Sequence, residues 1–170
     1  MLGARNSIRN FMVRSFMNKK LWINDPDCLM LREKNTKLTP EERMRQQEAD
    51  SLFLVNQYAK EYYEKQLFET DLGKSIGLSY FKERGFREET IKKFGLGYAP
   101  DGKDKFTLTA VNANYNIDLL KRLGLTSQYG SDFFRNRVMF SIHNLSGKVV
   151  ALAGRIMAKD VKAPKYINST

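Results

Sequence analysis

The order of its hydrophobic patterns constrains the fold of this chain most, because helical spacing comes first and strand alternation comes last. From Thr39 to about Phe68, apolar side chains recur three and four positions apart, which is the repeat of a helix with one buried face. Thr39 can cap this helix, Pro40 suits its first turn, and Glu42 stands where it can complete a capping box. We therefore expect one long helix whose aromatic stripe lies in a core.

Glycines are expected to end the shorter helices that follow. Gly85, Gly95 and Gly124 can each take the left-handed conformation that commonly ends a helix. The pattern between these glycines predicts short helices at 75–84, 87–94, 103–111 and 117–123. Residues 96–99 are expected to be extended and to lead into a turn.

The pattern changes to strands after Gly130. Residues 138–143 alternate and are rich in β-formers, and residues 148–154 form a second such run beyond an Asn-Leu-Ser-Gly loop. A short third strand is expected within 164–167. Helices first and strands later indicate an α+β fold, in which a helical N-terminal half is followed by a small antiparallel sheet.

Charge and composition limit the kinds of partner and site that the chain can have. The 170-residue chain has a net charge of +10, and residues 133–170 hold seven basic side chains against one acid. A patch of one sign attracts polyanions, so this pattern fits either a nucleic-acid partner or a merely solvated surface. One cysteine and one histidine exclude an internal disulfide and argue against a structural zinc site. No apolar run is long enough to span a bilayer, so we expect a cytoplasmic protein without membrane contact.

Three apparent motifs for phosphate binding or catalysis are not supported by the sequence around them. The run Gly73-Lys74-Ser75 resembles the end of a phosphate-binding loop, but Phe68 occupies the position of the required glycine. Cys28 and His143 could pair as nucleophile and base, yet nothing in the sequence brings them together. The run Asp25-Pro26-Asp27 favours a turn rather than a pair of catalytic carboxylates.

The basic hairpin region is the best candidate site. Arg135 and Arg137 stand two apart, so in an extended chain both guanidinium groups point the same way and can meet successive phosphates. Arg155 follows Gly154, where the missing side chain permits close approach of a ligand or of another backbone. The next strand adds a cation, an aromatic ring and an amide, which are Lys165, Tyr166 and Asn168. Such a surface suits single-stranded nucleic acid or nucleotides, although solvated basic residues would give the same pattern.

Successive motifs in this region resemble those of bacterial DNA primases. They are the runs 134–140 (FRNRVMF), 145–155 (LSGKVVALAGR) and 164–169 (PKYINS). Upstream, residues 80–100 resemble the segment that opens the polymerase domain of that family. The resemblance covers residues 48–170 and departs from the family's pattern at Ser141 and Leu152, where relatives usually carry Pro and Phe.

The resemblance implies a role in binding template and nucleotides, because that family makes short RNA primers on single-stranded DNA. The implied binding residues are Arg84, Arg135, Arg137, Arg155, Lys165 and Asn168. The family holds magnesium on acidic residues of a separate catalytic module, so we expect this chain to supply no catalytic or metal-binding residue and to be inactive alone. The implied partners are single-stranded DNA and ribonucleotides, together with the replicative helicase through other parts of the full protein.

The first 45 or so residues resemble a different family. The run from Arg14 to Glu42 is similar to a piece of bacterial TIM-barrel α-galactosidases, although the barrel and its catalytic carboxylates cannot fit here. We therefore expect two parts, a helical and extended segment over 1–47 and the primase-like subdomain over 48–170. Two alternatives stay open: a chimeric, non-catalytic chain with a vestigial nucleic-acid site, and a remnant of a carbohydrate-active enzyme.

Overall fold

A computed structural model of the chain describes residues 38–157 and 163–170. Two units can be separated along the chain, Met1–Arg43 and Met44–Thr170. The predictions for Cys28, for the turn at 25–27 and for most of the α-galactosidase-like run fall outside the described residues. They therefore stay predictions.

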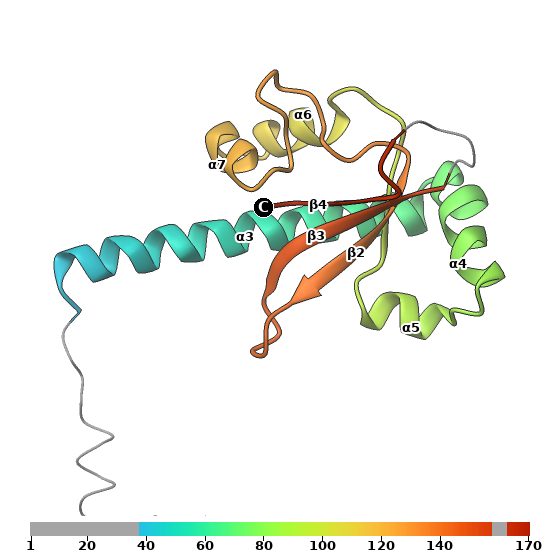
Figure 1. The fold of residues 1–170 in the computed structure, drawn as a ribbon, viewed down its shortest axis with the longest axis horizontal. Helices are drawn as coiled ribbons and strands as arrows, with labels where there is room; N and C mark the ends of the chain where they lie inside the picture. Colours follow the sequence, from blue (N-terminus) through green and yellow to red (C-terminus); the bar gives the residue numbers. More distant parts are fainter. Residues whose placement is uncertain (1–37, 158–162) are drawn as a thin grey trace, which may run out of the picture. The chain divides into compact units, whose positions relative to one another are not determined.

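The longest element is α3 (Pro40–Glu69), which begins at the predicted capping box (Figure 1). The backbone N–H of Thr39 donates to Glu42 Oε2 at 2.8 Å, and the N–H of Glu42 donates to Thr39 Oγ1 at 3.2 Å. The predicted stripe is buried and includes Val55, Ala59, Tyr63 and Leu67. Neither α3 nor any other helix in the described part of the chain is long and apolar enough to cross a membrane.

An antiparallel sheet follows most of the helices, with its strands in the order β1-β2-β3-β4. The strands are β1 (Gly97–Ala99), β2 (Arg137–His143), β3 (Val149–Ile156) and β4 (Tyr166–Asn168). The predicted hairpin is the β2–β3 pair, in which Met139 lies opposite Gly154. Residues 97–99, which were expected only to be extended, add β1 beside β2. The predicted α+β fold is confirmed.

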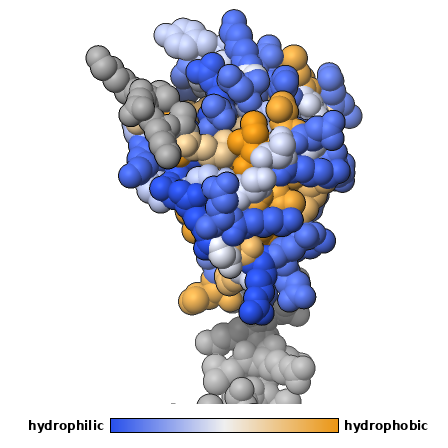
Figure 2. All heavy atoms as spheres, turned by 90° about the vertical axis from the view of Figure 1, so that its right-hand side faces the viewer, coloured by the Kyte–Doolittle hydropathy of each residue, from blue (hydrophilic) through white to orange (hydrophobic). Residues whose placement is uncertain are grey.

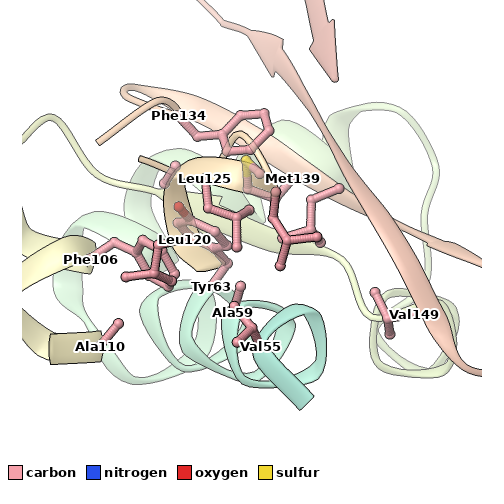
Figure 3. Packing of buried hydrophobic residues seen from close by; sticks show 13 residues of the cluster. Val55, Ala59, Tyr63, Phe106, Ala110, Leu120, Leu125, Phe134, Met139 and Val149 are labelled. Carbon is pink, nitrogen blue, oxygen red and sulfur yellow. The ribbon is translucent and has the colours of Figure 1, made fainter. Parts of the chain in front are cut away.

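One face of the sheet packs on α3 and on two short helices, α6 (Lys105–Asn112) and α7 (Ile117–Arg122). Strand alternation places Ala99, Met139 and Leu152 on this face, where all three are buried. Figure 3 shows side chains of α3, α6, α7 and the strands converging in this core. At its centre the rings of Tyr63 and Phe106 stack with their centroids 5.3 Å apart. This core holds the long helix against the sheet.

The opposite face of the sheet is covered over β1 and β2 by three short helices. These are η2 (Gly73–Leu78), α4 (Ser79–Glu83) and α5 (Glu88–Lys93). Phe81 of α4 and Ile91 of α5 pack there with Tyr98 and Val138 of the sheet. The sheet therefore carries a second, smaller core on this side.

The helix predicted over 75–84 differs from the structure at its start, because residues 73–78 form the π-helix η2. A Cβ added at Gly73 would lie 1.8 Å from the carbonyl oxygen of Gln66, and one at Gly77 would lie 2.6 Å from Leu67 Cδ1. Glycine alone allows this wide turn to lie so close to the end of α3. The run Gly73-Lys74-Ser75 follows a helix rather than a strand, which also excludes a phosphate-binding loop.

Helix α6 begins at Lys105, later than predicted, and its cap comes from a distant residue. The buried carboxylate of Asp132 accepts hydrogen bonds from the backbone N–H groups of Phe106 and Thr107, each at 2.9 Å. Thr107 Oγ1 donates to the same carboxylate at 2.7 Å. A negative charge is favourable at a helix N-terminus. Asp132 thereby fastens the loop before β2 to α6.

Candidate nucleic-acid interface

Two of the predicted arginines meet around one tyrosine. Arg84 directly follows α4 as its C-cap, and its Cζ lies 3.7 Å from the ring centroid of Tyr80, four residues earlier. Arg155 belongs to β3, and its Cζ lies 5.6 Å from the Tyr80 centroid and 5.5 Å from the centroid of Tyr166 in β4. These distances are within the range of cation–π attraction. We call Tyr80, Arg84, Arg155 and Tyr166 the arginine–tyrosine cluster.

The sheet register brings an amide to the same face. Arg155 lies opposite Tyr166, and Ala153 lies opposite Asn168. Residues opposite each other in an antiparallel pair share a face, and so do residues two apart along a strand. Tyr166 is 55% exposed and Asn168 is also exposed. This part of the sheet thus offers an aromatic ring, an amide and the guanidinium group of Arg155, and Arg84 adds a second guanidinium group from the end of α4.

The side of the molecule that carries α4 and α5 is mixed in polarity. Figure 2 views the side that carries α4 and α5 and shows a band of hydrophobic side chains among hydrophilic ones. Within the cluster, Arg155 Nε and Tyr80 Oη are buried and have no hydrogen-bond partner among the described residues. Buried polar groups are normally paired, because leaving one unpaired costs about 1–3 kcal/mol. The cluster therefore retains hydrogen-bonding capacity that the described residues do not use.

Arg137 does not point the same way as Arg135. Asn136 between them has a φ of 50°, which breaks the alternation of an extended chain. Arg135 is exposed, whereas Arg137 is only 6% exposed and burial lowers its pKa. The Nη1 group of Arg137 donates at 3.2, 3.1 and 3.4 Å to the carbonyl oxygens of Gly154, Pro164 and Lys165. The expectation that both arginines meet successive phosphates is therefore wrong in its geometry.

Gly154 does permit close approach, but the approaching groups are side chains of this chain. A Cβ at this position would lie 2.6 Å from Phe134 Cδ1 and 3.0 Å from Arg137 Cδ. The predicted entry of a ligand or another backbone is therefore replaced by the packing of Phe134 and Arg137 against β3.

The two remaining predicted residues lie at different distances from the cluster along the chain. Lys165 directly precedes Tyr166, its side chain is exposed, and its carbonyl oxygen accepts from the N–H of Ile156 at 3.0 Å. Arg135 is exposed in the loop before β2, and within the described ranges no hydrogen bond or cation–π contact joins it to the cluster. The structure thus gathers Arg84 and Arg155, places Asn168 on the same sheet face and leaves Arg135 apart.

Sequence reasoning missed Tyr80 as a member of the site. A signal was present, because Tyr80 stands four residues before Arg84 in a predicted helix, where side chains of that spacing meet. Its contact with Arg155 could not be read in the same way, since that contact depends on how α4 packs on the sheet.

The described residues do not fit a magnesium site. Across residues 38–157 and 163–170, no group of three or more His, Cys, Asp or Glu side chains could hold a metal ion. The buried carboxylate of Asp132 is already engaged in the cap of α6.

Comparison with known sequences points to one family. The family model described as DNA primase catalytic core, N-terminal domain, matches residues 62–170. The DNA primase of Halalkalibacterium halodurans is 39% identical over 125 residues, which cover 69% of this chain and 20% of that protein. The DNA primase of Listeria innocua is 32% identical over 149 residues, which cover 85% of this chain and 23% of that protein. This chain thus spans about a fifth of the length of the curated relatives it matches.

Solved primase structures share the fold. The catalytic domain of the DnaG primase bound to single-stranded DNA gives a TM-score of 0.63 at 30% identity, covering 72% of this chain and 39% of that chain. The RNA polymerase domain of Mycobacterium tuberculosis primase, in complex with a DNA duplex that has a 6-nucleotide overhang, gives a TM-score of 0.64 at 28% identity and covers 71% and 38%. The chain therefore belongs to the family of the N-terminal domain of the DNA primase catalytic core.

Proposed function

We propose that this chain supplies part of the surface on which a DNA primase holds its single-stranded template and its ribonucleotides during primer synthesis. The arginine–tyrosine cluster carries this proposal, since it combines two guanidinium groups with two aromatic rings. The solved primase catalytic domain bound to single-stranded DNA, which has the same fold over 72% of this chain, supports it.

The cluster has the chemistry that single strands require. Tyr166 offers a half-exposed ring, and stacking of one base on such a ring contributes about 1–3 kcal/mol. Arg84 lies against the Tyr80 ring and donates from Nη1 to the carbonyl oxygen of Tyr80 at 3.5 Å, so the remaining N–H groups of its exposed guanidinium can meet a phosphate. Base stacking and phosphate pairing together favour an unpaired strand, because a duplex hides the faces of its bases.

Three further predicted residues extend this surface. Asn168 shares the sheet face of Arg155 and Tyr166, so its amide can donate to and accept from a base edge or a ribose hydroxyl. Lys165 brings an exposed ammonium one position before Tyr166, and Arg135 brings an exposed guanidinium in the loop before β2. We assign these three residues to the edges of the same surface.

The activity of the complete primase is a separate part of the proposal. Primer synthesis is a nucleotidyl transfer in the cytoplasm, and phosphoryl transfer depends mostly on positioning and charge stabilisation. Magnesium would be bound by acidic residues of the catalytic module in the full-length protein, and the replicative helicase would also contact other parts. We therefore assign the described residues to binding and orientation rather than to catalysis.

The direct test is fluorescence anisotropy of a labelled single-stranded oligonucleotide, titrated with the 170-residue chain at several salt concentrations. The expected affinity falls steeply with salt, with a log–log slope of about 0.7 for each phosphate neutralised. Replacing Arg84 and Arg155 together with alanine should weaken binding and make that slope shallower.

A matched control removes the same charge elsewhere. Arg45 of α3 and Lys121 of α7 lie outside the cluster, so their double alanine variant should keep nearly the wild-type affinity and slope. Weak binding that does not depend on salt, or equal losses in both double variants, would favour the alternative of a vestigial site and overturn the proposal.

A further inference from the structure

The side chain of Arg137 is held within the sheet, unlike that of an arginine that binds phosphate. Its side chain is almost fully buried, and its Nη1 donates to three backbone carbonyl oxygens, those of Gly154, Pro164 and Lys165. Gly154 makes room for it, because a Cβ there would lie 3.0 Å from Arg137 Cδ. The guanidinium group stays charged despite its lowered pKa, and the three carbonyl dipoles compensate for the lost water.

Two of these carbonyl groups, those of Pro164 and Lys165, directly precede strand β4. That strand has only three residues in register with β3, so few bonds of the ladder hold it. At its entrance, Ile156 N–H donates to the carbonyl oxygen of Lys165 at 3.0 Å, and Arg137 adds its bonds to the same oxygen and to that of Pro164. At its exit, Ser169 N–H donates to Leu152 O at 2.8 Å. Arg137 thus holds one end of β4 while Leu152 and Ser169 hold the other.

The end of β4 that Arg137 holds carries two residues of the candidate interface. Lys165 lies at the entrance, Tyr166 follows it, and Tyr166 pairs with Arg155 across the strands. Loss of the Arg137 bonds would leave Lys165 and Tyr166 attached to β3 through fewer contacts. The position of this ring and this ammonium relative to Arg155 therefore depends on a side chain that lies on the other face of the sheet.

We propose that Arg137 is a positioning residue for the candidate nucleic-acid interface: it fixes Lys165 and Tyr166 beside Arg155 and does not itself neutralise a phosphate. This inference rests on the proposed function, because it assigns Arg137 an indirect role in the same binding surface. It reverses the direct role that the spacing of Arg135 and Arg137 suggested.

The first readout uses the free protein and needs no nucleic acid. Arg137→Met keeps much of the side-chain volume and removes all three hydrogen bonds. Amide hydrogen exchange at Ile156 should then become faster, while exchange at Ser169 and Thr170, at the exit of β4, stays as in the wild type. Unchanged exchange at Ile156 would overturn the inference whatever the binding data show.

The second readout is a double-mutant cycle with the labelled single-stranded oligonucleotide. Arg137→Met should weaken binding by about tenfold, and combining it with Lys165→Ala and Tyr166→Ala should add almost nothing. As the matched control, Arg135→Met should weaken binding in the Lys165→Ala, Tyr166→Ala variant by as much as it does in the wild type. A direct phosphate ligand at 137 would instead give additive losses.

Arg137→Lys separates charge from geometry and is the milder change if the methionine variant does not fold. Lysine keeps the cation but cannot reproduce the reach of the guanidinium group, so it should show the same faster exchange at Ile156 and the same weaker binding. Full recovery of binding by lysine would overturn the inference. A wild-type chain that fails to bind the oligonucleotide would overturn the proposed function, and the positioning role with it.

Discussion

The two faces of the sheet differ in how completely they are covered. On the face that packs on α3, α6 and α7, the strands contribute buried apolar side chains, and the Tyr63 ring stacks on Phe106 in a closed core. On the other face, η2, α4 and α5 cover β1 and β2, while Arg155, Tyr166 and Asn168 of β3 and β4 are at least partly exposed. We call this the open face. Strand alternation therefore lets one short sheet provide stability on one side and a candidate binding surface on the other.

The contrast is clearest in two tyrosines. Tyr63 is buried among aromatic rings, and the ring of Tyr80 lies near the guanidinium groups of both Arg84 and Arg155. The same residue type thus serves packing on the α3 side and cation binding on the α4 side. Changes to the aromatic core around Tyr63 should act on stability, and changes in the arginine–tyrosine cluster should act on binding.

The largest expected effect comes from the closed core. Phe106→Ala should lower the free energy of unfolding by about 3–5 kcal/mol, because it leaves a cavity beside Tyr63. Urea denaturation followed by circular dichroism measures this change. Tyr129→Ala, at a side chain that is 99% exposed, is the control and should change stability by less than about 0.5 kcal/mol. Similar losses in both variants would contradict the description of the core.

Asp132 should have the next largest effect. Asp132→Ala removes the acceptor for the N–H groups of Phe106 and Thr107, so the free energy of unfolding should fall by about 2 kcal/mol. Asp118→Ala removes an exposed carboxylate from the first turn of α7 and should cost much less. If the two variants were equally stable, the cap provided across the fold would have no energetic role.

On the open face, Tyr166→Ala should weaken binding of a single-stranded oligonucleotide by about 1–2 kcal/mol. The ring is 55% exposed, so the free energy of unfolding should change by less than about 0.5 kcal/mol. Tyr166→Phe keeps the ring and should bind nearly as well as the wild type. A large loss of stability with unchanged binding would place Tyr166 with the core rather than with the interface.

The smallest effect concerns pH. Burial, followed by the charge of Asp132, raises the pKa of Tyr63 well above the usual value of 10.0. The unfolded state therefore loses its phenol proton first, so this tyrosine causes stability to fall as the pH rises above about 10. Tyr63→Phe should leave stability at pH 7 almost unchanged and make the alkaline loss shallower. Urea unfolding of both proteins at pH 7 and above pH 10 measures the difference, and equally steep losses would contradict this account.

The sequence predicted those parts of the fold that depend on local signals. The capping box of Thr39 and Glu42, the buried stripe of α3 and the β2–β3 hairpin each follow from patterns within one or two elements. The cap of α6 by Asp132 could not be read from sequence, because its partners lie 25 and 26 residues away and the contact depends on tertiary packing.

The candidate site shows the same division. The sequence selected Arg84, Arg155 and Asn168, and the structure brings them to one face. The shared direction predicted for Arg135 and Arg137 is wrong, because a two-residue spacing gives a shared direction only in an extended chain and Asn136 has a positive φ. The contact of Tyr80 with Arg155 joins α4 to β3, so only the folded chain reveals it.

Amide hydrogen exchange of the chain with and without a single-stranded oligonucleotide tests directly whether the sheet face of Arg155 and Tyr166 binds nucleic acid. Binding should slow exchange in α4 near Arg84, in β3 around Arg155 and in β4, while α6 and α7 on the other face keep their rates. Slower exchange confined to α6 and α7, or no change in any described segment at saturating oligonucleotide, would contradict the assignment of nucleic-acid binding to the open face.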